Sequence, residues 1–217
     1  MDRLAFTSLA AVNNQGEIRA QITNNLANVS TIGFKESFEL ASKTIDVVGD
    51  GFNSRASVDI DAVDVINLKP GVPNQTGRAM DVSLQGSTVL GVQADNGEIG
   101  FTRRGDLRVS PTGLIENAAG HLILGEGGPI NVPPGQLVNI SPDGTVFGSL
   151  PGQPDAESVE LGKLMLRDAS EMPLTRRTDG LFESILPAFK GIEFPTGPQP
   201  SSLQSGSLEG SNVNPIE

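Results

Sequence analysis

An amphipathic N-terminal segment that ends in a burst of helix-stopping residues constrains this chain more than any other feature. Its apolar residues recur mostly three or four positions apart, a spacing that lays them along one stripe of an α-helix. The stripe consists of Leu4, Ala5, Leu9, Val12, Ile18, Ile22, Leu26 and Val29. Asn and Ser compete for nearby backbone groups and Gly reaches left-handed angles at low cost, so the chain should leave the helix between Asn28 and Gly33. We therefore predict a helix from about Asp2 to Asn28 whose stripe needs a partner surface.

Three motifs accompany this helix. The first reads Asn24-Asn25-Leu26-Ala27-Asn28-Val29-Ser30-Thr31-Ile32-Gly33-Phe34-Lys35, the second spans Thr76–Gly86, and the third spans Ser207–Pro215. Together they resemble the signatures of the flagellar axial proteins, the rod and hook subunits of the bacterial flagellum. The opening Met1-Asp2-Arg3, the stretch 125–130 and the ending 214–217 are most similar to the proximal-rod members of that family.

The resemblance implies a structural role. Packed N- and C-terminal helices of many copies would form an inner tube, with β domains as the outer layer, and the helical assembly would transmit torque through the periplasm. The implied partners are copies of this chain, other rod proteins and the flagellar type III export apparatus, which needs no cleaved signal peptide. A distal-rod or hook subunit is the alternative within the family, and a β-rich extracellular adhesin is the alternative from another class.

Two sets of residues follow from these expectations: a predicted assembly interface and a family signature. The assembly interface is predicted to consist of Leu4, Leu9, Val12, Ile18, Ile22, Leu26 and Val29. The family signature consists of Asn24, Asn25, Leu26, Ala27, Asn28, Thr31, Gly33, Phe34, Lys35, Leu208, Glu209, Ser211, Asn212, Val213 and Asn214.

Beyond the helix, the composition favours short β-strands, because 26 Gly and 15 Pro supply turns at short intervals. The expected strands are 81–84, 88–93, 99–102, 106–109, 114–116, 121–124, 137–140, 146–147, 161–166 and 181–184. An alternating stretch, 58–68, predicts a further half-buried strand with a bulge. The fold class is therefore mainly β with a long N-terminal α-helix, the β body being a sandwich or an irregular barrel.

Four regions follow from these patterns. Residues 1–30 form the axial helix, 31–73 an extended connecting segment with a strand, 74–194 the β-rich body, and 195–217 a linker with the start of a C-terminal axial helix. Pro195, Gly197, Pro198 and Pro200 mark the linker. Asn214-Pro215 is a favourable helix start, so we expect the natural chain to continue past Glu217 as an amphipathic helix.

Charge and composition disfavour several classes of binding partner. The net charge of −11 disfavours nucleic acid and anionic membrane surfaces, and no small-molecule ligand is indicated. The chain has no Cys, which excludes disulfides and thiolate chemistry. No apolar run approaches the roughly 20 residues of a membrane span, and no cleavable signal peptide is visible.

No motif indicates catalysis, a cofactor or a metal. The lone histidine, His121, follows a turn and has no indicated nucleophile or carboxylate partner. Asp59, Asp61 and Asp64 lack the Gly and the closing Glu of a calcium loop. A peptidoglycan hydrolase would need paired carboxylates in a cleft, which no motif supports. The pairs Arg103-Arg104 and Arg176-Arg177 fit either solvated turns or contacts with acidic patches on neighbouring subunits.

Overall fold

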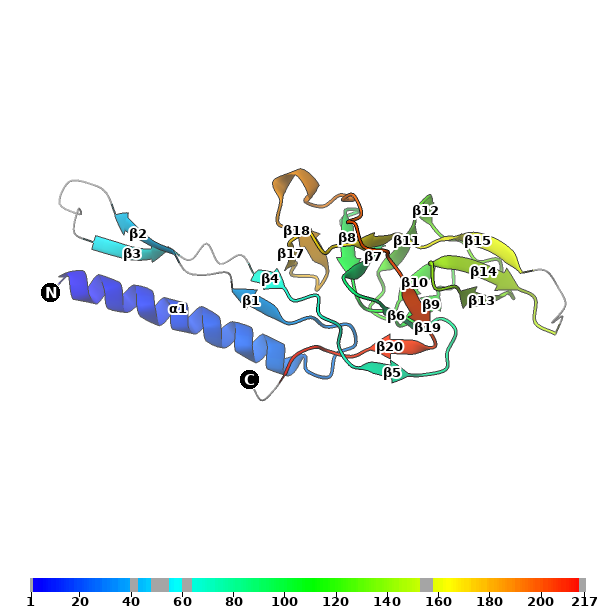
Figure 1. Cartoon of the computed structure of the whole chain (residues 1–217), viewed down its shortest axis with the longest axis horizontal. Helices are drawn as coiled ribbons and strands as arrows, with labels where there is room; N and C mark the ends of the chain where they lie inside the picture. The colour runs from blue at the N-terminus through cyan, green and yellow to red at the C-terminus, as the bar shows by residue number, and fades with distance from the viewer. Residues whose placement is uncertain (1, 40–42, 48–54, 60–63, 153–157, 215–217) are drawn as a thin grey trace.

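The chain forms an elongated molecule with a helix at one end and a three-stranded sheet at the other (Figure 1). The structure, a computed structural model, describes residues 2–39, 43–47, 55–59, 64–152 and 158–214. Strands dominate the described residues, so the expectation of a mainly β chain with an N-terminal helix is confirmed.

The helix α1 spans Asp2–Ala27, within one residue of the predicted end. At 1.5 Å per residue its 26 residues extend about 39 Å. The hairpin of β2 (Lys43–Val47) and β3 (Arg55–Asp59) lies alongside it (Figure 1). A second antiparallel pair, β1 (Ser37–Glu39) with β4 (Asp64–Ile66), connects this end of the molecule to the body.

The body is built on a nine-stranded sheet whose described pairs are all antiparallel. Its path runs in the order β17 (Leu174–Arg176), β18 (Phe182–Ser184), β8 (Ile99–Thr102), β7 (Thr88–Gln93), β11 (Leu122–Gly125), β10 (Ile115–Asn117) and β9 (Leu107–Val109). Beside that path, β12 (Gly128–Pro129) pairs with β11 and β16 (Leu166–Asp168) pairs with β7. The three-stranded sheet is β13 (Leu137–Ile140), β14 (Thr145–Ser149) and β15 (Val159–Lys163). The short 3-10 helix η1 spans Pro187–Phe189.

The end of the chain returns to the body as strands. β19 (Leu203–Ser205) pairs with β6 (Val82–Leu84), and β20 (Ser207–Glu209) pairs with β5 (Pro73–Gln75). From β20 the chain runs back toward the C-terminal end of α1 (Figure 1). Two segments far apart in sequence therefore meet where the helix ends.

Apolar strand residues fill the body. One buried cluster includes Val82, Leu90, Leu107, Ile123 and Leu164, which come from strands or bridges far apart in the chain. A second cluster gathers around the Phe101 and Phe194 rings, whose centroids lie 4.4 Å apart. The first cluster has no aromatic side chain, whereas three of the seven buried residues of the second cluster are Phe.

Several strand predictions have the observed bounds, including 88–93, 99–102 and 137–140. The single strand predicted over 161–166 is wrong, because β15 ends at Lys163 and β16 begins at Leu166. Between them Leu164 donates to the Gly144 carbonyl and Met165 donates to the Leu124 carbonyl, so the chain crosses from one sheet to the other.

The strand predicted over 58–68 is described only in part. Residues 58–59 lie in β3 and residues 64–66 lie in β4, whereas 67–68 lie past the end of β4; the predicted bulge at 62–63 lies outside the described residues. The predicted sandwich or barrel is not confirmed, since the nine-stranded path stays open at β17 and β9.

Candidate functional site

The apolar stripe of α1 lies at the surface of the isolated chain. The side chains of Leu9, Val12, Ile22 and Leu26 are each more than half exposed, and Ile18 is also exposed. Val29 is half-buried, and the side chain of Leu4 lies outside the part that the structure describes. Fully burying a Val, Leu or Ile side chain is worth roughly 1.5–3 kcal/mol, so a partner surface would gain substantially here.

The signature asparagines end the helix. Asn28 donates from its backbone and from Nδ2 to the Asn24 carbonyl, at 3.2 and 2.9 Å, and its Oδ1 accepts from the Thr31 hydroxyl at 3.1 Å. These bonds satisfy groups that the helix terminus leaves open. One turn earlier, Gln21 and Asn25 donate from their side-chain amides to the Ser37 carbonyl, which folds the next segment back along the helix.

Gly33 is the point at which the chain meets the body. Its φ of +67° lies in the left-handed region, and its N–H donates to the Glu209 carbonyl at 2.8 Å. A Cβ at this position would lie 2.5 Å from the backbone carbonyl of Arg103 and 2.6 Å from the Arg104 nitrogen. Only glycine fits both the backbone angle and the close approach.

Phe34 and Lys35 then insert into the body. The Phe34 side chain is buried, and the Arg176 guanidinium lies over its ring, 3.8 Å from the centroid. Arg176 Nη2 also donates to the Lys35 carbonyl. A cation over an aromatic face is attracted by the ring quadrupole, so Arg176 holds this segment from the β17 side.

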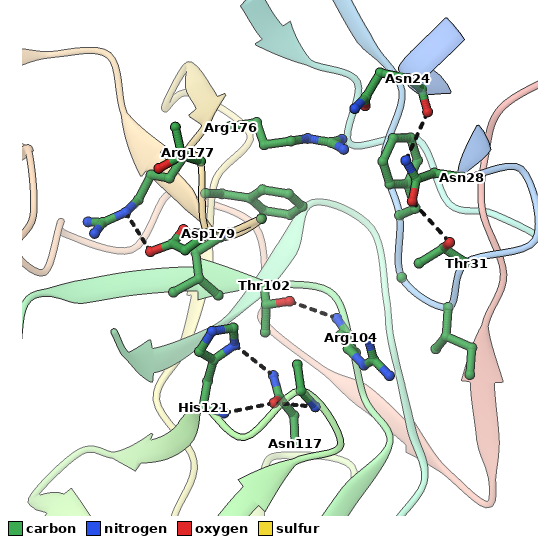
Figure 2. Close-up of a pocket in the computed structure, with 18 residues that line it drawn as sticks. Asn24, Asn28, Thr31, Thr102, Arg104, Asn117, His121, Arg176, Arg177 and Asp179 are labelled. Carbon is green, nitrogen blue, oxygen red and sulfur yellow. Dashed lines mark hydrogen bonds and ion pairs between the residues drawn. The ribbon is translucent and has the colours of Figure 1, made fainter. Parts of the chain in front are cut away.

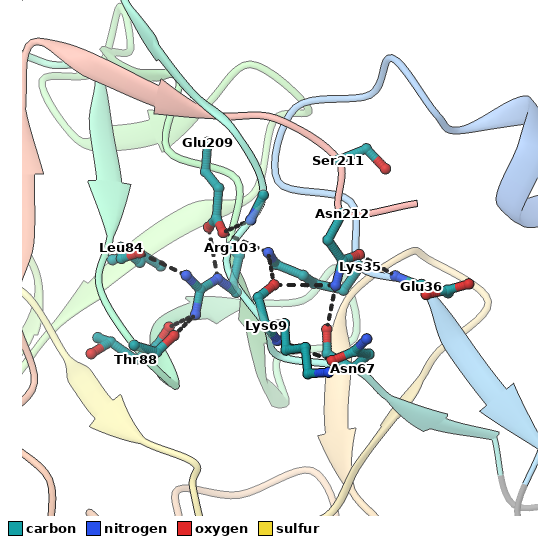
Figure 3. A network of polar contacts seen from close by, with 12 residues as sticks. Lys35, Glu36, Asn67, Lys69, Leu84, Thr88, Arg103, Glu209, Ser211 and Asn212 are labelled. Carbon is teal, nitrogen blue, oxygen red and sulfur yellow. Dashed lines mark hydrogen bonds and ion pairs between the residues drawn. The ribbon is translucent and has the colours of Figure 1, made fainter. Parts of the chain in front are cut away.

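A buried ion cluster joins three parts of the chain (Figure 3). Lys35 Nζ lies 2.5 Å from Glu209 Oε1, and Arg103 Nε lies 2.7 Å from Glu209 Oε2. All three side chains are at most 1% exposed. Lys35 Nζ donates further to the Lys69 carbonyl, and Oε1 also accepts from the Gly71 backbone N–H. We call residues 33–36, 67–71 and 209–212 together with Arg103 the junction.

Arg103 anchors the junction to the body. Its Nη1 donates to the Gly86 and Thr88 carbonyls at 2.6 and 3.0 Å, and its Nη2 donates to the Leu84 carbonyl at 2.6 Å. The guanidinium thus binds backbone of β6, of β7 and of the turn between them (Figure 3). Such fixed donors give Arg a geometric role that a Lys at this position could not fill.

Asn212 connects two other segments of the junction through hydrogen bonds of its side chain. Its Oδ1 accepts from the Glu36 backbone N–H at 2.7 Å, and its Nδ2 donates to the Asn67 and Lys69 carbonyls at 2.8 and 3.1 Å. One side chain from the third motif therefore bridges Glu36, the residue just after the first motif, and the segment before β5 (Figure 3). Of the other signature residues, Leu208 pairs with Asn74 in the β5–β20 ladder, and the Ser211 hydroxyl accepts from the Val213 N–H.

Burial makes the cluster sensitive to the loss of any member. It contains two cations and one carboxylate, so Glu209 is the counter-ion for both Lys35 and Arg103. Removing one partner of a buried pair leaves an uncompensated charge and typically costs about 3–5 kcal/mol. The junction is therefore stabilised by the ion pairs of Glu209 with Lys35 and Arg103 as well as by its backbone hydrogen bonds.

The stability of the chain should rise with pH between about 8 and 10.5. Burial, reinforced by the Arg103 charge and opposed by Glu209, lowers the pKa of Lys35 from 10.5 to about 8. In this window the unfolded chain binds a proton that the folded chain has released, so raising the pH favours the folded state, by as much as about 3 kcal/mol. Denaturant melts at pH 7.5 and 10.5 measure this gain.

Lys35→Met is the control for that prediction. The chain contains no Cys or Tyr, so the remaining lysines and the terminal amine are the other groups that ordinarily titrate in this range. The pH-dependent gain should be absent in Lys35→Met. An equal gain in both proteins would show that Lys35 is not its source.

Sequence reasoning did not identify Arg103 as a site residue. The expectation that Arg103-Arg104 forms solvated turns or subunit contacts is wrong for Arg103, which is fully buried. Arg104 is paired with Asp106 at 2.8 Å, and Arg177 has Glu98, Asp179 and Glu183 as partners. The doubled arginine was the only sequence signal, and it does not reveal which member is buried.

A cavity of about 390 Å³ opens beside the junction, between the end of α1 and the body (Figure 2). Its lining includes Asn24, Thr31, Arg104, Arg177 and His121. Figure 2 shows His121 directed toward Asn117, with Nδ1 3.4 Å from the Asn117 amide nitrogen. The lining presents amides, guanidinium groups and hydroxyls around one carboxylate, that of Asp179.

The described residues provide neither a cluster of metal ligands nor a membrane-spanning helix. The described residues include no group of three or more His, Cys, Asp or Glu that could hold a metal ion, although Asp61 of the excluded calcium motif lies outside them. Within the part of the chain that the structure covers, no helix is sufficiently long and apolar to span a membrane.

Comparison with known proteins identifies the family. Residues 83–148 match the family model described as the flagellar hook protein FlgE/F/G D1 domain. The flagellar basal-body rod protein FlgF of Salmonella typhimurium is 36% identical over 218 residues, covering 100% of this chain and 86% of that protein. FlgF of Escherichia coli is 34% identical, with coverage of 100% and 85%. FlgG of Buchnera aphidicola (subsp. Schizaphis graminum) is 29% identical, with coverage of 90% and 80%.

These matches extend through the first and third motifs as well as the body. The FlgF proteins share a higher identity with this chain than the FlgG protein does and align with all of it. The matched names are those of structural rod proteins. The chain therefore belongs to the family of flagellar basal-body rod proteins and is a structural rod subunit similar to FlgF.

Proposed function

We propose that the chain is a subunit of the proximal rod, located in the periplasmic part of the flagellar basal body, and that it assembles helically to transmit torque. Its partners would be copies of itself and other rod proteins, delivered by the flagellar type III export apparatus without a cleaved signal peptide. The observation that supports this most strongly is the exposed apolar stripe of α1. Such a stripe is stable in water only when a partner buries it.

The interface would consist of Leu4, Leu9, Val12, Ile18, Ile22, Leu26 and Val29. Contacts that repeat from subunit to subunit without closing generate a helical filament. Torque would pass from these contacts to the body through the junction, whose buried ion cluster leaves little freedom at the helix end. The outer layer of the assembly would then be formed by the nine-stranded and three-stranded sheets.

A proximal-rod role is favoured over a distal-rod or hook role by the FlgF proteins of Salmonella typhimurium and Escherichia coli, which are 36% and 34% identical and align with the whole chain. An adhesin role has no use for an exposed helical stripe anchored to the body by a buried ion cluster.

We expect residues 2–28 to exchange their amide hydrogens faster than the body strands in dilute monomer, because a helix that is mostly formed but has its apolar face in water opens locally at low cost. Strands of the body should be protected in the same sample, which supplies the internal control. In assembled rods the helix should become protected. Strong protection of α1 in dilute monomer would instead favour packing within one chain.

A further inference from the structure

We propose that Glu209 is a positioning residue that fixes the direction of α1 relative to the β body. Its side chain and its backbone both contact the segment that follows the helix: the carboxylate binds Lys35 and the carbonyl accepts from Gly33. The same carboxylate binds Arg103, which is fastened to the body. A single residue from the last strand thus connects the helix segment to the sheet.

The connection is long-range in sequence. Glu209 is 174 residues from Lys35 and 106 from Arg103. Both cations therefore depend on β20 being in place before they have a counter-ion. A chain in which β20 has not yet docked, or has detached, would have to keep Lys35 in water, since an unpaired ammonium is not buried at low cost.

The polar contacts of Glu209 are fully used. Oε1 accepts from Lys35 Nζ at 2.5 Å and from the Gly71 N–H at 2.8 Å, while Oε2 accepts from Arg103 Nε at 2.7 Å. A glutamine at this position would have the same size, but its amide nitrogen would face cationic donors. Glu209→Gln should therefore release the Lys35 segment without removing apolar packing from the body.

A small rotation at the C-terminal end of α1 displaces the distant part of the helix by a larger distance. The side-chain amides of Gln21 and Asn25 bind the Ser37 carbonyl in β1, so they attach the helix to the β1–β4 pair and not directly to the nine-stranded sheet. Asn13 lies 14 residues before Ala27, or about 21 Å along the axis. A rotation of about 10° at the helix end would move Asn13 by about 4 Å. The β1–β4 pair and the contact of Phe34 with Arg176 would still tether the helix, so we expect a broadened direction and not detachment.

Distances between two spin labels test this inference on the monomer, where assembly plays no part. The chain has no native Cys, so Asn13→Cys on α1 and Ala118→Cys on the body give one labelled pair at exposed positions. We expect one narrow distance distribution with Glu209 in place. Glu209→Gln should broaden or shift that distribution by several ångströms while the body still unfolds in one cooperative transition, at a lower temperature because Arg103 loses its counter-ion.

The matched control is Glu116→Gln. Glu116 pairs with Arg108 at 2.7 Å, the same distance as the Arg103–Glu209 contact, but Arg108 is 55% exposed. This variant should leave the distribution narrow. If Glu209→Gln fails to fold, Lys35→Met decides, because it removes the bond between the helix segment and the Glu209 carboxylate and keeps the Arg103 pair. An unchanged narrow distribution in a folded Glu209→Gln chain, or in Lys35→Met, would overturn the inference.

Discussion

Replacing Leu26 with Asp is expected to abolish incorporation into the rod, and with it swimming, while the body keeps its melting transition. Leu26 is 54% exposed in the isolated chain, so the monomer can hydrate the new carboxylate. In the proposed assembly the same position is buried between helices, where an unpaired charge costs several kcal/mol per ion. The cost recurs at every copy, which should prevent assembly. Complementation of a strain lacking the gene, scored by motility and by subunit content of purified basal bodies, measures the effect.

Asn13→Asp is the matched control for this charge. Asn13 is exposed on the same helix, and at 100° per residue it lies about 140° around the axis from Leu26. The substitution adds one carboxylate of nearly the same shape as the native amide, away from the Leu26 side of the stripe. Motility should be retained. Normal swimming with Leu26→Asp would show that Leu26 is not in an interface, and loss with both variants would show that the stripe is not the only buried face.

The parts of the fold set by short-range patterns could be predicted from the sequence. The helix end follows from asparagines that compete for the last carbonyls, and Asn28 does bind the Asn24 carbonyl. The hairpin strands 88–93 and 99–102 follow from short runs rich in β-branched and apolar residues on either side of the Asn96-Gly97 turn. In each case the interacting residues lie within about a dozen positions of one another.

The junction could not be predicted in the same way, although the three motifs contain most of its residues. Lys35, Glu209 and Asn212 were identified only as members of a family signature, and no local pattern shows that they meet. Arg103 lies outside those motifs and was interpreted as a turn residue, because charged side chains are seldom fully buried. Its burial depends on three backbone carbonyls of β6, β7 and the turn that joins them, which come together only in the folded body.

The strands at the end of the chain illustrate the same limit. Residues 195–217 have a linker-like composition, yet β19 and β20 lie within them and pair with β6 and β5. Each strand has three residues and only one large apolar side chain, Leu203 or Leu208, so no apolar alternation marks them as strands. What holds them is the pairing itself, the burial of Leu203 in the core of the body and, at Glu209, two buried cations. Strand formation there depends on these long-range contacts and not on local propensity.

The junction explains why the first motif ends in glycine followed by an aromatic and a lysine. The turn must pass within van der Waals contact of the Arg103 backbone, then place a ring under Arg176 and an ammonium beside Glu209. Each of these contacts uses a different property of the residue concerned: the missing Cβ, the π-face and the charge. The motif therefore encodes an attachment to the body as well as the end of a helix.

Gly33→Ala is expected to destabilise the chain by more than about 3 kcal/mol. Part of the loss, about 1–2 kcal/mol, comes from placing a residue with a Cβ at a φ of +67°. The larger part comes from the Cβ itself, which would lie 2.5 Å from the Arg103 carbonyl group. That backbone cannot yield, because the Arg103 side chain is fixed by four hydrogen bonds to Glu209 and to three carbonyls. Thermal melting should show a fall of roughly 6–12 °C, since 1 kcal/mol corresponds to about 2–4 °C in a chain of this size.

Gly97→Ala separates the two contributions. Gly97 has a φ of +83°, but a Cβ there would meet nothing within 4 Å, so this variant carries the backbone penalty alone and should lose only about 1–2 kcal/mol. If the junction opens locally in Gly33→Ala, the fall in melting temperature will be smaller than expected. The opening would then be detected as fast hydrogen exchange at the residue 33 amide, which otherwise donates to the Glu209 carbonyl. If Gly33→Ala loses no more than Gly97→Ala and keeps that amide protected, the chain does not need the close approach of residue 33 to the body, and the junction would be held by its charges alone.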